Sequence, residues 1–232
     1  MENSHIVGRF DQDLKNIQSR VLAMGELVGT QLRDATAVLT DPQSEEISRI
    51  VATDRQVNRM NGSISDRCER LIALRQPMAA DLREALSPIS VAAELERIGD
   101  HAKSTAKKAR KLGNERISPA LFEIISHMSS LVVGQLGDVL RAYRDEDVPL
   151  SRDIFDKDRE VDALNKNLLA DAVSILNASE ADANTVLQAV LISRNLERAG
   201  DHVVNIARHN IHIVTGANTA GKDKSDGQQS AK

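Results

Sequence analysis

Two short segments of the chain carry a glutamate and an aspartate at the same spacing. They are LERIGDH at 95–101 and LERAGDH at 196–202, which differ at a single position. Residues four apart on an α-helix lie on the same face, and like charges at that spacing repel each other. The pairs are Glu96 with Asp100 and Glu197 with Asp201. On a partly dehydrated face, each pair needs protons, a cationic side chain or a metal ion to neutralise it.

A second duplicated segment supplies further oxygen atoms. DRQVNRMN at 54–61 matches DREVDALN at 158–165, and its polar residues again stand four apart. These residues interrupt the apolar stripes of their helices, so we expect them to face neighbouring helices. If the helices that carry the two motifs are adjacent and antiparallel, each half presents one cluster of oxygen ligands. The candidate ligands are Asp54, Asn58, Glu96 and Asp100 in the first half and Asp158, Asp162, Glu197 and Asp201 in the second.

An all-oxygen ligand set is typical of sites for hard cations such as Mg²⁺, Mn²⁺, Ca²⁺ or iron. Asn58 stands where the second half has Asp162, so the first cluster has one fewer charge and should bind metal more weakly. Pairing with arginine is the alternative, because an arginine directly follows four of the acids. These arginines are Arg55, Arg97, Arg159 and Arg198. The residues alone leave metal binding and arginine pairing both open.

A glycine and a histidine flank the aspartate of each LERxGDH copy. Gly99 and Gly200 lie inside predicted helices, where glycine costs about 1 kcal/mol relative to alanine. Either close helix packing or close approach to a metal would explain them. His101 and His202 follow the aspartates and lie about 100° around the helix, so we do not predict them as ligands.

The motifs do not indicate an enzyme. The third residue after each glutamate is a glycine, whereas ferritin-like di-iron sites need a histidine there. The chain has no Walker loop, no Gly-x-Ser-x-Gly and no His-Glu-x-x-His. A metal-dependent phosphate-ester hydrolase is therefore the least supported hypothesis.

The elements that must position these residues are helices. Apolar residues recur at helical spacing almost throughout, and they predict helices over about 6–40, 43–75, 78–112, 117–146, 149–177 and 181–214. Aromatic residues make up 2% of the 232 residues, which favours helix–helix packing over a sandwich of sheets. The two repeats predict an all-α fold of two tandem antiparallel three-helix bundles related by internal duplication. We place the bundles at 6–113 and 117–214 and a disordered tail at 215–232.

Capping residues mark several of the predicted boundaries. Asp41 with Pro42 is expected to begin the second helix, and Ser118 with Pro119 the fourth. Ser179, with Asp182 three residues later, resembles a capping box before the sixth.

Bulk composition restricts the function. The net charge of −4 does not favour binding to nucleic acid. The one cysteine excludes an intramolecular disulfide and suits a reducing cytosol. No apolar run approaches the ~18 residues of a membrane span, and the first residues do not form a signal peptide. We therefore expect a soluble cytoplasmic protein.

The duplicated LERxGDH and Asp-Arg-x-Val motifs, together with RQPMAADLR at 75–83 and VLAMGELV at 21–28, resemble the PhoU family of bacterial phosphate-uptake regulators. The resemblance covers essentially all of 6–214. It implies tandem three-helix bundles, no enzymatic activity and bound metal ions (Mg, Mn, Fe or Zn). The implied ligands are the acids above, and Asn58 departs from the acidic form of the motif.

The resemblance also implies a function. Members of the family restrain phosphate uptake through a phosphate ABC transporter and hold the phosphate-starvation response off when phosphate is plentiful. The expected partners are the transporter's ATPase subunit (PstB-type) and a sensor histidine kinase (PhoR-type), with a homodimer as the expected assembly.

Overall fold

The computed structural model describes residues 2–178 and 182–217, and the described part contains helices and no strand. The helices are α1 (Glu2–Ala37), α2 (Glu46–Arg75), α3 (Ala79–Lys111), α4 (Pro119–Asp145), α5 (Val148–Ala178) and α6 (Ala183–Thr215), with a 3₁₀ turn, η1 (Val38–Thr40), after α1. All six predicted helices are present, and the predicted all-α class is confirmed. Most of the predicted disordered tail lies outside the described residues.

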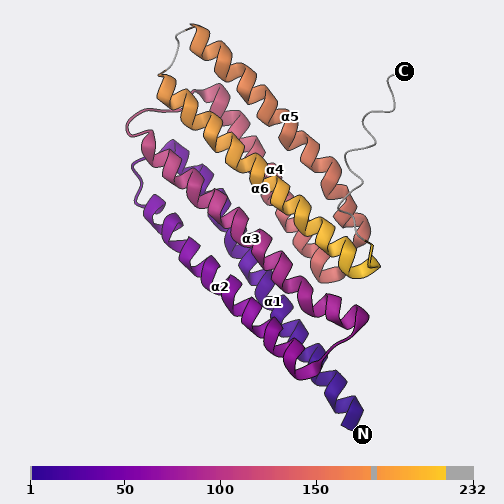
Figure 1. Ribbon diagram of the computed structural model, residues 1–232. Coiled ribbons are helices and arrows are strands. Elements are labelled where there is room, and N and C mark those ends of the chain that lie inside the picture. The colour runs from indigo at the N-terminus through magenta and orange to yellow at the C-terminus, as the bar shows by residue number, and fades with distance from the viewer. Residues whose placement is uncertain (1, 179–181, 218–232) are drawn as a thin grey trace, which may run out of the picture.

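The six helices form two three-helix bundles that lie side by side. Helix α1 packs against α2 and α3, and α4 packs against α5 and α6. Figure 1 shows α2, α3, α6 and α5 next to one another in that order, with α1 and α4 behind them. The bundles contact each other through α3 and α6 and through α1 and α4. The duplicated bundle architecture is confirmed, and the side-by-side packing places the motif helices α3 and α6 against each other.

The apolar stripes read from the sequence form the core. Buried aliphatic side chains from both bundles belong to one continuous cluster. Helix α4 is the one described helix whose length and composition would allow it to cross a membrane. In this fold its residues Ile125, Met128 and Val132 are fully buried in that cluster, and other apolar residues of the helix are partly buried against it.

Two helix starts follow the capping rules. Ser118 accepts a hydrogen bond from the amide of Leu121, and Pro119 is the first residue of α4. Asp182 caps α6 by accepting a hydrogen bond from the amide of Thr185. Ser179, which we had predicted as the cap, lies outside the described residues.

The predicted start of α2 at Asp41 and Pro42 was wrong. The amide of Asp41 donates to the carbonyl oxygen of Val38, so Asp41 closes the 3₁₀ turn that ends the preceding helix. Helix α2 begins at Glu46, after a turn in which the Ser44 hydroxyl accepts from the amide of Glu46. The N-cap position of α2 is Glu45, which makes no side-chain capping hydrogen bond.

Candidate metal centres in the two halves

The first cluster lies between α2 and α3, which are neighbours as the sequence reasoning required. Asp54 on α2 is buried, and Glu96 and Asp100 on α3 are partly buried. Asn58, the fourth predicted member, is exposed, and its side chain makes no hydrogen bond within the described part of the chain. The structure therefore brings three of the four predicted residues to the interface between the helices.

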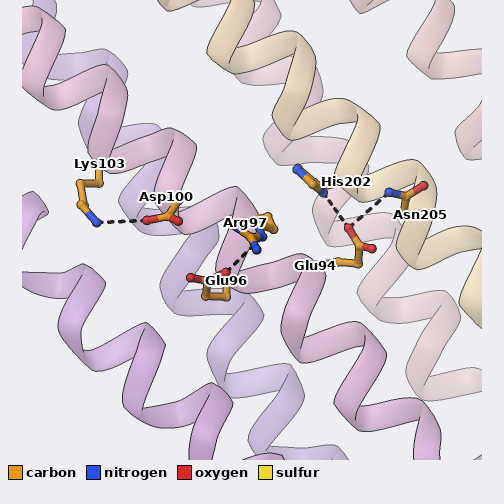
Figure 2. A network of polar contacts seen from close by, with 7 residues as sticks. All are labelled: Glu94, Glu96, Arg97, Asp100, Lys103, His202 and Asn205. Atoms are coloured by element: carbon orange, nitrogen blue, oxygen red, sulfur yellow. Dashed lines mark hydrogen bonds and ion pairs between the residues drawn. The ribbon is translucent and has the colours of Figure 1, made fainter.

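A lysine pairs with two of the three carboxylates of this first cluster. The Lys103 ammonium donates hydrogen bonds to Asp54 Oδ2 at 2.8 Å and to Asp100 Oδ1 at 3.0 Å, and Figure 2 shows the second of these. The hydrogen bond with Asp54 is the largest cause of a raised pKa for Lys103. Glu96 lies 3.6 Å from the guanidinium of its neighbour Arg97. The cation beside Asp54 and Asp100 is thus an amine that the sequence reasoning had not considered.

The second cluster lies between α5 and α6 and has no equivalent lysine. Asp158 and Glu197 are partly buried, whereas Asp162 and Asp201 are exposed. Arg194 Nε lies 3.8 Å from Glu197 Oε2, and the charge of Arg208 acts to lower the pKa of Asp158 and of Asp201.

Glu197 Oε2 is buried and has no hydrogen-bond partner. A buried carboxylate oxygen without a donor is costly, so it is a position at which a cation would be stabilising. In the first cluster Asp54 Oδ1 also lacks a donor, but Lys103 donates to the other oxygen of that carboxylate.

Burial and mutual repulsion raise the pKa values of acids in the second cluster. Burial raises the pKa of Asp158 to about 7, and the charges of Asp162, Asp201 and Glu197 add to the effect. Burial likewise raises the pKa of Glu197 and of Asp201, with repulsion from the other acids contributing. The repulsion predicted from the sequence is therefore present in the second cluster. It also acts in the first, where burial raises the pKa of Glu96 and the charges of Asp100 and Asp54 add to the effect.

The two motif glycines serve different purposes. A Cβ added at Gly200 would come within 2.8 Å of Asp158 Oδ1, so glycine lets this carboxylate lie against the α6 backbone. A Cβ at Gly99 would meet Gln31 Oε1 and Val57 Cγ1, both at 3.3 Å. Gly99 thus allows close helix packing, whereas Gly200 admits a candidate ligand.

The second cluster fits a metal ion in its chemistry. Its donors are all carboxylate oxygens, which suit hard divalent or trivalent cations. Among the described residues, however, no three His, Cys, Asp or Glu side chains already stand where one ion would contact them together. Binding would require the exposed Asp162 and Asp201 side chains to turn toward Asp158 and Glu197. A cleft of about 480 Å³, which Asp158 and Asp201 line, gives an ion access.

A polar junction that the sequence reasoning missed links the two halves beside this cluster. Glu94 on α3 contacts His202 Nδ1 on α6 at 2.6 Å and accepts a hydrogen bond from Asn205 at 3.3 Å, as Figure 2 shows. The His101 and His202 rings stack with centroids 5.4 Å apart. Burial alone would raise the pKa of Glu94, but hydrogen bonds from His202, His209 and Asn205 outweigh it and lower the pKa to about 2. The junction fixes the residue that follows Asp201.

Comparison with known proteins places the chain in a family. The model of the PhoU domain matches residues 21–109 and again 125–209. A phosphate-specific transport system accessory protein PhoU homolog of Pseudomonas aeruginosa is 35% identical over 212 residues, which are 91% of this chain and 88% of that protein. The accessory protein PhoU of Escherichia coli K12 is 32% identical over 214 residues, which are 92% of this chain and 88% of that protein.

Solved structures agree in fold. The crystal structure of PhoU from Pseudomonas aeruginosa superposes with a TM-score of 0.84 at 35% identity, covering 90% of this chain and 100% of that one. The phosphate transport system regulatory protein PhoU from Streptococcus pneumoniae gives 0.83 at 27% identity, covering 90% and 98%. The two matches to the domain model, the full-length relatives and the shared fold together establish that the chain belongs to the PhoU family.

Proposed function

We propose that this chain is a cytoplasmic negative regulator of phosphate uptake and of the phosphate-starvation response. It acts as a metal-binding adaptor between a phosphate ABC transporter and a sensor histidine kinase. Its membership in a family of regulatory accessory proteins supports the regulatory role. The names of its relatives, accessory proteins of phosphate-specific transport, support the link to a transporter.

The second cluster is the observation that carries the metal-binding part of the proposal. It combines four carboxylates, raised pKa values for three of them and a buried Glu197 oxygen without a donor. A hard cation there would neutralise these charges and hold α5 against α6. The cofactor is a divalent or trivalent ion of Mg, Mn, Fe or Zn, and the chemistry it supplies is charge neutralisation between two helices.

The adaptor acts through contact between proteins. The partners are the PstB-type ATPase subunit of the transporter and a PhoR-type histidine kinase, and the chain itself assembles as a homodimer. Fixing α5 to α6 would define the surface of the second bundle that a partner recognises. Neither nucleic acid nor insertion into a membrane has a part in this mechanism.

Elemental analysis of gently purified protein tests the metal site. The wild type should carry metal, and Glu197→Ala with Asp201→Ala should remove it. The matched pair Glu96→Ala with Asp100→Ala is the control for general loss of acidic residues. If the native protein carries no metal at any tested ion concentration, the chain is a metal-free helical scaffold whose carboxylates pair with basic side chains.

A reporter assay tests the regulatory role. Deleting the gene should derepress a starvation-responsive phosphatase reporter in high phosphate, and the wild-type gene should restore repression. Regulation by contact also predicts that the purified protein hydrolyses neither phosphate esters nor polyphosphate. An unchanged reporter, with expression in the parent confirmed, would exclude the regulatory role.

A further inference from the structure

Two of the differences between the duplicated motifs lie at the clusters. Aligning LERIGDHAK (95–103) with LERAGDHVV (196–204) places Lys103 at the position of Val204. The other motif places Asn58 at the position of Asp162. The first half has therefore gained a positive charge and lost a negative one relative to the second.

Lys103 occupies the position of a bridging cation. Its ammonium contacts one carboxylate from α2 and one from α3, at 2.8 and 3.0 Å. These are charge-assisted hydrogen bonds of ordinary length, and one partner, Asp54, is almost completely buried. Figure 2 shows Lys103 extending along α3 toward Asp100. A metal ion that bridges the two helices would contact these same oxygens.

The corresponding position of the second half cannot supply such a cation. Val204 is apolar, 6% exposed, and lines the cleft next to Asp158 and Asp201. Four carboxylates thus stand in the second cluster, whose cleft Arg208 also lines, against three carboxylates and a bridging ammonium in the first. An ion that entered the first cluster would have to displace Lys103 or lie within a few ångströms of its charge, where repulsion is strong.

We propose that Lys103 replaces the metal ion of the first half, so that this chain binds metal at the second cluster alone. The inference rests on the metal site of the proposed function and adds that Lys103, rather than a metal ion, joins α2 to α3 in the first bundle. The second bundle is then the half whose helix contact depends on metal. The two bundles of one chain would differ in their response to the same ion.

The experiment moves the site from one half to the other, with Mn²⁺ as the probe and bound metal measured by equilibrium dialysis. Glu197→Ala with Asp201→Ala should reduce bound Mn²⁺ to background. Adding Asn58→Asp and Lys103→Val to that protein should restore binding, because the first cluster then has the residues of the second. Lys107→Val with Asn58→Asp is the matched control, since Lys107 is exposed on the same helix, and it should restore nothing.

Two outcomes would decide against the inference. If Mn²⁺ stays on the Glu197/Asp201 variant and leaves when Glu96 and Asp100 are changed to alanine, the first cluster binds metal despite Lys103. Failure to restore binding, in a variant whose circular dichroism and melting show a folded protein, also overturns the inference. Lys103→Gln, a smaller change, is tested in parallel in case Lys103→Val does not fold.

A wild type that binds no Mn²⁺ would remove the metal site of the proposed function instead. The role of Lys103 would then be decided by Asn58→Asp with Lys103→Val in the wild-type background. A gain of Mn²⁺ there supports the replacement of metal by lysine, and no gain in the folded variant overturns it.

Discussion

The two halves of the molecule carry the same Glu-x-x-x-Asp pair between equivalent helices, yet the acids meet different surroundings. Asp54 and Asp100 share the ammonium of Lys103, whereas Asp158 has a pKa of about 7 among other acids. The difference comes from two positions, Lys103 against Val204 and Asn58 against Asp162. A repeated motif therefore conserves the placement of charge, while its neighbours decide how that charge is neutralised.

The two motif glycines also differ in what they lie against. Gly99 lets α3 pack closely against Val57 and Gln31, which requires no ion. Gly200 instead leaves room for the Asp158 carboxylate beside the backbone of α6. The glycine of the first half thus serves helix packing, and that of the second half makes room for a carboxylate of the candidate site.

The largest expected effect on metal binding comes from placing a lysine in the second cluster, at the position that matches Lys103. Val204→Lys should raise the Kd for Mn²⁺ by more than about 100-fold, since a unit charge at ~4 Å contributes about 4 kcal/mol at an effective dielectric constant of ~20. Isothermal titration calorimetry measures this, with Val204→Leu as the apolar control. An unchanged Kd in a folded Val204→Lys protein would contradict the proposal that a lysine at this position replaces the metal ion.

Removing the native lysine should destabilise the metal-free protein. Lys103→Met leaves Asp54 buried without a cation, and losing hydrogen bonds to a buried charge costs about 2 kcal/mol. Urea unfolding in EDTA measures the change, and Lys107→Met should stay within ~0.5 kcal/mol of the wild type. Equal stabilities for the two variants would mean that Lys103 is an ordinary surface charge.

Substituting the two motif glycines should change the Kd for Mn²⁺ to different extents, and by less than Val204→Lys does. Gly200→Ala pushes the Asp158 carboxylate away from α6 and should raise the Kd for Mn²⁺ by about tenfold, or ~1.4 kcal/mol. Gly99→Ala should leave the Kd unchanged, because it changes packing in the other half. Titration of both variants side by side tests this, and equal effects would contradict the assignment of Gly200 to the site.

The smallest effect is a pH dependence in the metal-free protein. The pKa of Asp158 is about 7 in the fold, against an ordinary value of 3.8. Between these values the folded state binds more protons than the unfolded state, so stability should rise as the pH falls from 7.5 to 6.5. Melting curves in EDTA measure this slope, and Asp158→Asn should flatten it. A slope that persists in Asp158→Asn would assign it to another group.

Much of the site was predictable because it depends on helical periodicity. Residues four apart share a face in any α-helix, so the pairs at Glu96 and Glu197 followed from spacing alone. The difference between Lys103 and Val204 was also visible in the aligned copies. Its meaning was not, because a lysine three residues after an aspartate is exposed on most helices. Only the packing of α2 against α3 brings Asp54 within reach of its ammonium.

The sequence by itself determined the six helices, their grouping into two repeated bundles and the positions of the acids, since each of these follows from local spacing. The tertiary structure decided which cation stands beside each cluster, where α2 begins, and that Glu94 meets His202 between the bundles. Those features depend on how helices rotate and pack against one another. Their partners come from distant parts of the chain, 108 residues apart for Glu94 and His202.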